Sequence, residues 1–243
     1  MKSIRNPLLA LAVSLMTLAL SHQASATVLT AVNINDTGSA QYDSTSGLYT
    51  LTSTGGSSLS SSDYMTFDYT AISGNFTVST VVQSMEVSNT IDAAGLMATN
   101  GLDPSAVNAA SAYMNMSSST GGSSFYRTSA GVGNEGNPCA PCVSGSAPFT
   151  VTLSRSGNTF TESANGTVMT QQTIAMSNTI DVGLFLDGWE GASTTATFSN
   201  LQGFPTTSQA SGGAGTPTSV PEPKEAALLL LALAAVGGLR RKT

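Results

Sequence analysis

The chain has 243 residues, with 8 basic and 14 acidic side chains and a formal net charge of −6. The basic residues gather near the two ends, so that Arg127 and Arg155 are the basic residues of the long middle part. A middle part this acidic would repel nucleic-acid phosphates and offers no basic face to anionic lipid. We therefore expect neither a nucleic-acid-binding protein nor one that binds lipid surfaces electrostatically.

Residues 1–26 have the features of a secretory signal peptide. A positive start with Lys2 and Arg5 is followed by an apolar run at residues 8–20. A small-residue cleavage pattern with Ala24 and Ala26 comes next. We expect signal peptidase to cut after Ala26 and to leave a mature protein that begins near Thr27.

The single histidine, His22, lies within this leader, so the expected mature chain contains none. This absence removes a Ser-His-Asp triad, a histidine general base and the common zinc ligand sets. Retaining glycosidases need two carboxylates about 5–5.5 Å apart, and the glutamates at 86, 162 and 190 are isolated from one another in the sequence. We therefore expect a protein that is not an enzyme and that needs no cofactor.

The middle part, residues 27–203, is expected to form one all-β domain, because apolar and polar residues alternate between frequent turn signals. Asn165-Gly166 is the strongest hairpin signal, and the alternation slips near Val81, which indicates a β-bulge. The expected strands cover residues 48–53, 64–69, 76–87, 95–98, 110–116, 124–129, 149–155, 159–163, 180–186 and 196–198.

Two motifs in this domain are the most specific: L-x-R-x-G-N-x-F over residues 153–160 and T-A-T-F over residues 195–198. Together with the Gly-Asn-Phe-Thr-Val strand at 74–78, they resemble the concanavalin A-like modules of bacterial secreted proteins. The resemblance implies an antiparallel jelly-roll β-sandwich and a role with extracellular glycans. Residues 163–169 depart from it, because the aspartate and tryptophan that related modules usually carry in this turn are missing.

A candidate ligand site surrounds Trp189, the only tryptophan, which lies between Asp187 and Glu190. An exposed indole can stack on a sugar ring while carboxylates bond its hydroxyls. The alternative is that Trp189 anchors a loop against the rim of the sandwich.

Tyr126, Arg127 and Arg155 complete the candidate ligand residues. Arg155 is in phase with the apolar residues of its strand and Arg127 shares a face with Phe125, so each must find a partner. Either the arginines line a ligand groove, or each forms a structural ion pair with an aspartate such as Asp63, Asp68 or Asp181.

Cys139 and Cys142 lie in a loop rich in glycine, proline and serine, away from any βαβ pattern. In an oxidising compartment, a local disulfide is a simpler interpretation of this C-x-P-C sequence than a redox-active site is. Calcium binding stays open because carboxylates are suitable ligands, although no EF-hand spacing is present and we expect no metal site.

Residues 204–220 have the composition of a flexible linker. The tail, residues 221–243, begins with a Pro-Glu-Pro motif and continues through an apolar run at 226–239 to a basic end. At 1.5 Å per residue this run reaches about 21 Å, short of the roughly 30 Å bilayer core, so it is a poor permanent anchor. The motif and the basic cluster comprise Pro221, Glu222 and Pro223, and Arg240 and Arg241.

This tail resembles the PEP-CTERM sorting signal of Gram-negative bacteria, which implies processing by a membrane-embedded exosortase. We therefore expect an exported protein, held briefly in the inner membrane by a short C-terminal helix and then released to the cell surface or extracellular matrix. The leading hypothesis is a protein that binds or organises extracellular polysaccharide. The alternatives are a structural, glycosylated matrix or surface protein and, less favoured, an enzyme or an ice-binding protein.

Overall fold

The computed structural model describes residues 27, 29–55, 61–86, 91–116, 119–135, 143–188 and 193–205. Within these ranges the chain forms strands β1 to β14 and no helix, and no helix there could span a membrane. The expected all-β class is confirmed. The residues predicted to form the signal peptide and the sorting tail, and most of the predicted linker, lie outside the described residues.

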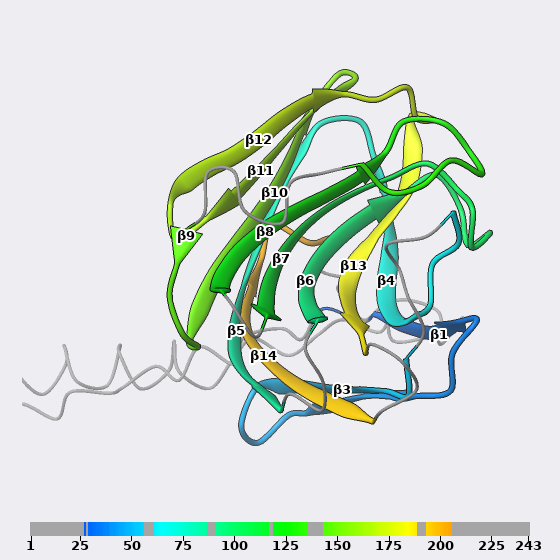
Figure 1. Cartoon of the computed structure of the whole chain (residues 1–243). Coiled ribbons are helices and arrows are strands. Elements are labelled where there is room, and N and C mark those ends of the chain that lie inside the picture. The colour runs from blue at the N-terminus through cyan, green and yellow to red at the C-terminus, as the bar shows by residue number, and fades with distance from the viewer. Residues whose placement is uncertain are drawn as a thin grey trace, which may run out of the picture. The chain divides into compact units, whose positions relative to one another are not determined.

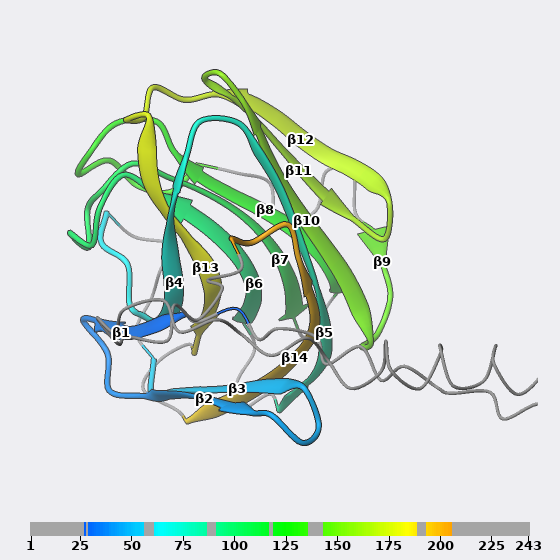
Figure 2. The ribbon, with the colours of Figure 1, turned by 180° about the vertical axis from the view of Figure 1, so that it is seen from behind.

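The strands form two antiparallel sheets of seven strands each (Figures 1 and 2). In spatial order the first sheet contains β1 (Thr30–Ile34), β4 (Met65–Ser73), β13 (Thr179–Asp187), β6 (Ile91–Thr99), β7 (Asn108–Met116), β8 (Ser119–Arg127) and β9 (Val143–Ser144). The second contains β12 (Thr167–Thr173), β11 (Thr159–Ala164), β10 (Phe149–Ser156), β5 (Phe76–Glu86), β14 (Thr194–Gln202), β3 (Leu48–Ser53) and β2 (Ser39–Asp43). The molecule is an antiparallel jelly-roll β-sandwich, as the sequence predicted.

The main core lies between the two sheets, where alternate residues of each strand point inward. In β10 every second residue from Phe149 to Arg155 is buried, which is the period of a half-buried strand. On the opposing sheet, Val182, Leu184 and Leu186 of β13 contribute to the same apolar cluster. The alternation visible in the sequence therefore sets which side chains meet.

A second apolar cluster covers the outer face of the first sheet. Phe185 alternates with the inward residues of β13, and Phe67, Met97, Ala112 and Phe125 extend the cluster across neighbouring strands. All five side chains are buried. Within the described residues, a large part of this face is therefore apolar.

Turns and bulges follow their sequence signals. Asn165 and Gly166 have φ values of 45° and 79°, as a tight hairpin between β11 and β12 requires. Thr197 of β14 pairs with Ser84 of β5, and the next residue of β14, Phe198, pairs with Val82 of β5. One residue of β5 between Val82 and Ser84 therefore has no partner on β14, which is a β-bulge. This bulge lies next to the predicted phase slip.

Several strands were not predicted from the sequence. β1 and β2 were missed because their exposed positions outnumber their buried ones, so they lack a clear apolar face. β9 is two residues long and was missed as well. These two strands are edge strands, β1 of the first sheet and β2 of the second.

Candidate functional site

The structure does not bring together those predicted ligand residues that it describes. Trp189 and Glu190, and the cysteines at 139 and 142, lie outside the described residues. The predicted ligand residues that are described are Tyr126, Arg127, Arg155 and Asp187.

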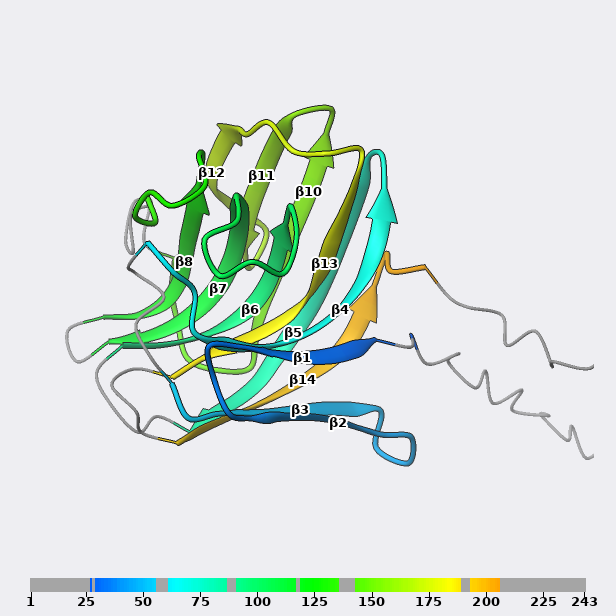
Figure 3. The same cartoon turned by 90° about the vertical axis from the view of Figure 1, so that its right-hand side faces the viewer.

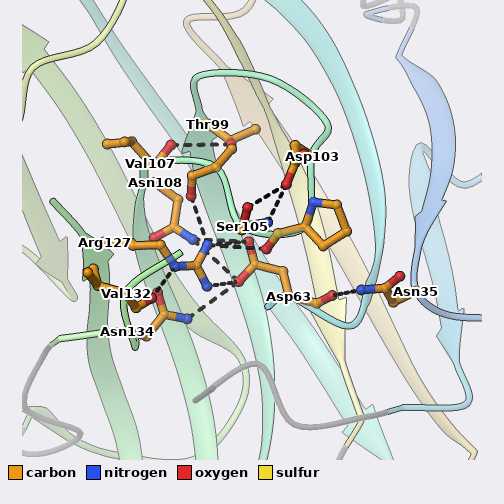
Figure 4. Close-up of polar contacts among 12 residues, drawn as sticks. Asn35, Asp63, Thr99, Asp103, Ser105, Val107, Asn108, Arg127, Val132 and Asn134 are labelled. Atoms are coloured by element: carbon orange, nitrogen blue, oxygen red, sulfur yellow. Dashed lines mark hydrogen bonds and ion pairs between the residues drawn. The ribbon is translucent and has the colours of Figure 1, made fainter. Parts of the chain in front are cut away.

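Arg127 ends strand β8 on the outer face of the first sheet and is fully buried. Its guanidinium forms a two-point ion pair with Asp63, with N–O distances of 2.7 and 3.1 Å. It also donates to the carbonyl oxygens of Val132, Pro104 and Ala106 (Figure 4). Of the two alternatives for Arg127, the structure therefore shows the ion pair.

Asp63 completes this closed network. Besides Arg127, its carboxylate accepts from the side-chain amide of Asn108 at 3.1 Å and from that of Asn134 at 3.5 Å. Burial raises the pKa of Asp63, while the Arg127 guanidinium counteracts this rise. Because each charged group already has its partners, this network acts in stability and offers little to a ligand.

Tyr126 and Asp187 lie apart from this network and from each other. Tyr126 points to the opposite face of β8 and packs against the core between the sheets. Asp187 shares the outer face of its sheet with Phe185, but it pairs with Ala93, at the end of β6 far from Arg127. No common groove joins the predicted residues that are described.

Arg155 lies in a different environment from Arg127. It ends the inward-facing row of β10, is 6 % exposed, and stacks over the ring of Phe160 at 5.4 Å from the ring centre. It donates to the carbonyl oxygens of Gly157 at 2.8 Å, Met176 at 3.2 Å and Asn178 at 3.4 Å.

For Arg155, the alternative of an ion pair with an aspartate is not found within the described residues. The ion pair found within the described residues is that of Arg127 with Asp63. Carbonyl oxygens supply partial negative charge, so they fix the guanidinium without neutralising it. Burial lowers the pKa of Arg155 from its usual value, but arginine stays protonated at any ordinary pH.

Arg155 lies in an open pocket of about 210 Å³ at the end of the sandwich where β10 turns into β11. Asn75, Asn158 and Asn178 surround the guanidinium, and all three are exposed. Asn75 is held in place, because its side-chain oxygen accepts from the backbone N–H of Gly157 at 2.8 Å. The amides of Asn158 and Asn178 make no hydrogen bond within the described residues, so they are available to a ligand.

This pocket combines the groups that recognise hydroxyl-rich molecules. Two N–H groups of the guanidinium are not used by the three carbonyls, and each free amide offers both donors and an acceptor. Of its residues, sequence reasoning found Arg155 and missed the three asparagines. They stand in Gly-Asn and Ser-Asn turns, whose composition fits an ordinary loop equally well, and only the fold brings the turns together.

Within the described residues no group of three His, Cys, Asp or Glu side chains is placed to hold a metal ion. Glu162 points between the sheets and is fully buried, and its carboxylate oxygens have no hydrogen-bond partner within the described residues. Burial raises its pKa well above the usual value, although the nearby Ser124 hydroxyl counteracts this rise.

No family model and no curated protein sequence matches the chain. Its fold is similar to that of a functionally unknown protein from Saccharomyces cerevisiae, with a TM-score of 0.56 and 15 % identity over 72 % of this chain and 95 % of that one. An alginate lyase from Pseudomonas aeruginosa aligns with a TM-score of 0.40 and 16 % identity over 53 % and 64 % of the two chains. An alginate lyase of polysaccharide lyase family 7 aligns with 0.39 and 11 % over 67 % and 80 %.

The sequence-based expectation that this chain is not an enzyme is wrong. It rested on the absence of histidine and of a glycosidase-type carboxylate pair, yet alginate lyases stand among the similar structures. At these identities the likeness concerns the fold, and a fold alone does not assign an activity.

Proposed function

We propose that this protein binds a polysaccharide outside the cell, and that the pocket around Arg155 holds one of its sugar units. One observation carries the proposal: Arg155, a cationic side chain that has no ion-pair partner among the residues the structure describes, faces a pocket ringed by three exposed asparagine side chains. Sugar hydroxyls both donate and accept hydrogen bonds, so they match amide and guanidinium groups in a concave site.

The charge of the chain favours a neutral polysaccharide. Acidic residues outnumber basic ones, and a net charge of −6 repels polyanions over the distance of their approach. A single guanidinium does not offset this repulsion along a chain of several charged sugars. We therefore propose that neutral glycans bind more tightly than polyuronates.

Export and sorting belong to the same proposal. The leader at 1–26 and the Pro-Glu-Pro tail at 221–243 support delivery to the cell surface or matrix, where such a glycan would be found. Fractionation of cells that make the full chain, compared with chains that end at residue 220, tests this part. Equal distribution of both chains between membrane, surface and medium would contradict a sorting role for the tail.

The binding experiment uses the purified full-length chain and a panel of immobilised neutral and acidic polysaccharides. We expect saturable binding to at least one neutral polysaccharide, and a loss of about tenfold or more when Asn158 and Asn178 are both changed to alanine. Gln41→Ala is the matched control, because it removes an exposed amide outside the pocket. The same incubations are examined for polysaccharide cleavage.

Two results would overturn the proposal. One is a panel without any bound polysaccharide, and the other is unchanged affinity of the Asn158→Ala/Asn178→Ala variant. Cleavage of a bound polysaccharide would add a reaction to the binding, without altering the assignment of the pocket.

A further inference from the structure

A second pocket lies on another side of the molecule and carries the opposite charge. It has a volume of about 240 Å³ and lies where β1 and β4 of the first sheet face β2 and β3 of the second. Figure 3 shows β1 above β3 and β2 at this edge of the sandwich. The side chains and backbone that line the pocket belong to Thr27, Leu29, Ala31, Ala40, Tyr42, Tyr49 and Asp68.

Asp68 is the charged group of this pocket. It lies on β4 opposite Ala31 of β1 and is 6 % exposed. Within the part of the chain that the structure describes, its carboxylate makes no hydrogen bond and no ion pair. A carboxylate in such a position is costly unless a partner comes from elsewhere, because burial removes its hydrating water.

No basic residue of the described chain can neutralise Asp68. The two that it contains are Arg127, which is paired with Asp63, and Arg155, which is held by carbonyl oxygens at the other pocket. A positive partner for Asp68 must therefore come from outside these residues.

The other walls of the pocket favour an organic cation over a metal ion. Calcium needs six to eight oxygen ligands, whereas one carboxylate faces this pocket. The rings of Tyr42 and Tyr49 lie side by side, with centres 4.5 Å apart, and aromatic rings attract ammonium groups. Leu29, Ala31 and Ala40 provide apolar surface for a carbon chain.

The two tyrosines have different places in the pocket. Tyr49 is buried, and its hydroxyl donates to the carbonyl oxygen of Thr27 at 2.8 Å, which fixes its ring. Tyr42 is 38 % exposed and pairs with Tyr49 across the two strands, so it stands at the entrance. A ligand would pass Tyr42 to reach Asp68.

We propose that this pocket binds a small protonated amine, whose ammonium group pairs with Asp68 and whose carbon skeleton packs against Tyr42, Tyr49 and the apolar wall. This site is separate from the Arg155 pocket and does not depend on the polysaccharide proposal. It gives the protein a second binding site, whose charged side chain is acidic, whereas that of the first site is basic.

The test compares n-butylammonium with 1-butanol, which has the same carbon chain and no charge. Calorimetric titration of the full-length chain at pH 7.5 is expected to show saturable binding of n-butylammonium and none of 1-butanol. Asp68→Asn should weaken n-butylammonium binding by about tenfold or more, because the charge pair is lost while the side-chain shape is kept. Glu86→Gln, which removes an exposed carboxylate outside the pocket, should leave binding unchanged.

The pH dependence offers a second measurement on the unchanged protein. Binding should weaken between pH 7.5 and pH 5, because protonation of Asp68 removes its charge, and burial raises the pKa of this carboxyl to about 6. The titratable groups that face Asp68 are Tyr42 of β2 and Tyr49 of β3. Burial raises the pKa of Tyr49 to about 12, so it stays neutral over this range. Its neighbours on β1 and β13 are Ala31 and Leu184, which do not titrate.

Three results would overturn this proposal: no binding of n-butylammonium, equal binding of 1-butanol, or undiminished binding by Asp68→Asn. Should Asp68→Asn fail to fold, Tyr42→Ala takes its place, because Tyr42 is half exposed and its loss leaves the core intact. Undiminished binding by Tyr42→Ala together with a flat pH profile would equally rule the site out.

Discussion

Arg127 ends strand β8 and Arg155 lies one residue before the end of β10, and both are buried, yet their surroundings differ. Arg127 is enclosed with Asp63 in a network in which each charge has its partner. Arg155 is held by three backbone carbonyls and the ring of Phe160, beside an open pocket of polar side chains. The difference teaches that burial of an arginine does not by itself distinguish a structural role from a binding role. The group that pairs with the guanidinium, a carboxylate for Arg127 and backbone carbonyls for Arg155, makes that distinction.

The largest effect is expected from breaking the closed pair. Asp63→Ala leaves the Arg127 guanidinium buried without its carboxylate, which should lower the free energy of unfolding by about 3–5 kcal/mol. Urea denaturation followed by circular dichroism measures this loss. Glu86→Ala is the control, because that carboxylate is exposed. A loss no larger than that of the control would contradict the structural role of the pair.

Replacement of Arg155 is expected to cause a smaller loss of stability than replacement of Asp63. Arg155→Met removes three hydrogen bonds but leaves no buried charge, and the freed carbonyls face a pocket that water can enter. We expect the free energy of unfolding to fall by about 1–2 kcal/mol. The comparison between the two arginines fails if the same denaturation experiment shows a larger loss for Arg155→Met than for Asp63→Ala.

The pH dependence of stability extends the comparison of the two arginines to a buried acidic residue, Asp68. Burial raises the pKa of Asp68 from 3.8 to about 6 in the folded protein. Between these values the folded state keeps a proton that the unfolded state releases, so stability should fall as pH rises from about 4 to about 6. Asp68→Asn should flatten this part of the profile, measured by urea denaturation at several pH values.

Asp103 provides a control of opposite sign. A hydrogen bond from the Ser105 hydroxyl lowers the pKa of Asp103, so its contribution is present at neutral pH and lost as pH falls below the ordinary value. Asp103→Asn should therefore leave the decrease between pH 4 and 6 in place. An unaltered profile in Asp68→Asn would show that Asp68 is not the group responsible.

The sequence predicted the class of fold because strand periodicity is a local property. The row from Phe149 to Arg155 and the Asn165-Gly166 turn each carry their signal within a few residues, and both lie where expected. β1 and β2 carry no such signal, since their few apolar residues become meaningful only when the edge of the sandwich closes over them.

The site could be predicted only in part, for a physical reason. The sequence shows that Arg155 is in phase with buried residues, but the choice of partner depends on contacts between distant segments. Asn75, Asn158 and Asn178 come from three separate turns, and nothing local marks them as neighbours. Asp63 reaches Arg127 across 64 positions of the chain, which is equally invisible to a local pattern.

The most direct test of the account follows the side-chain Nε–H signals of the arginines in a nitrogen-15 labelled full-length chain. A neutral oligosaccharide from the best-bound polysaccharide is added, and the signals of Arg155 and Arg127 are assigned with Arg155→Lys and Arg127→Lys. We predict that the Arg155 signal shifts in a saturable manner while the Arg127 signal stays in place. A bound oligosaccharide that leaves Arg155 unchanged, or that shifts Arg127 instead, would contradict the account.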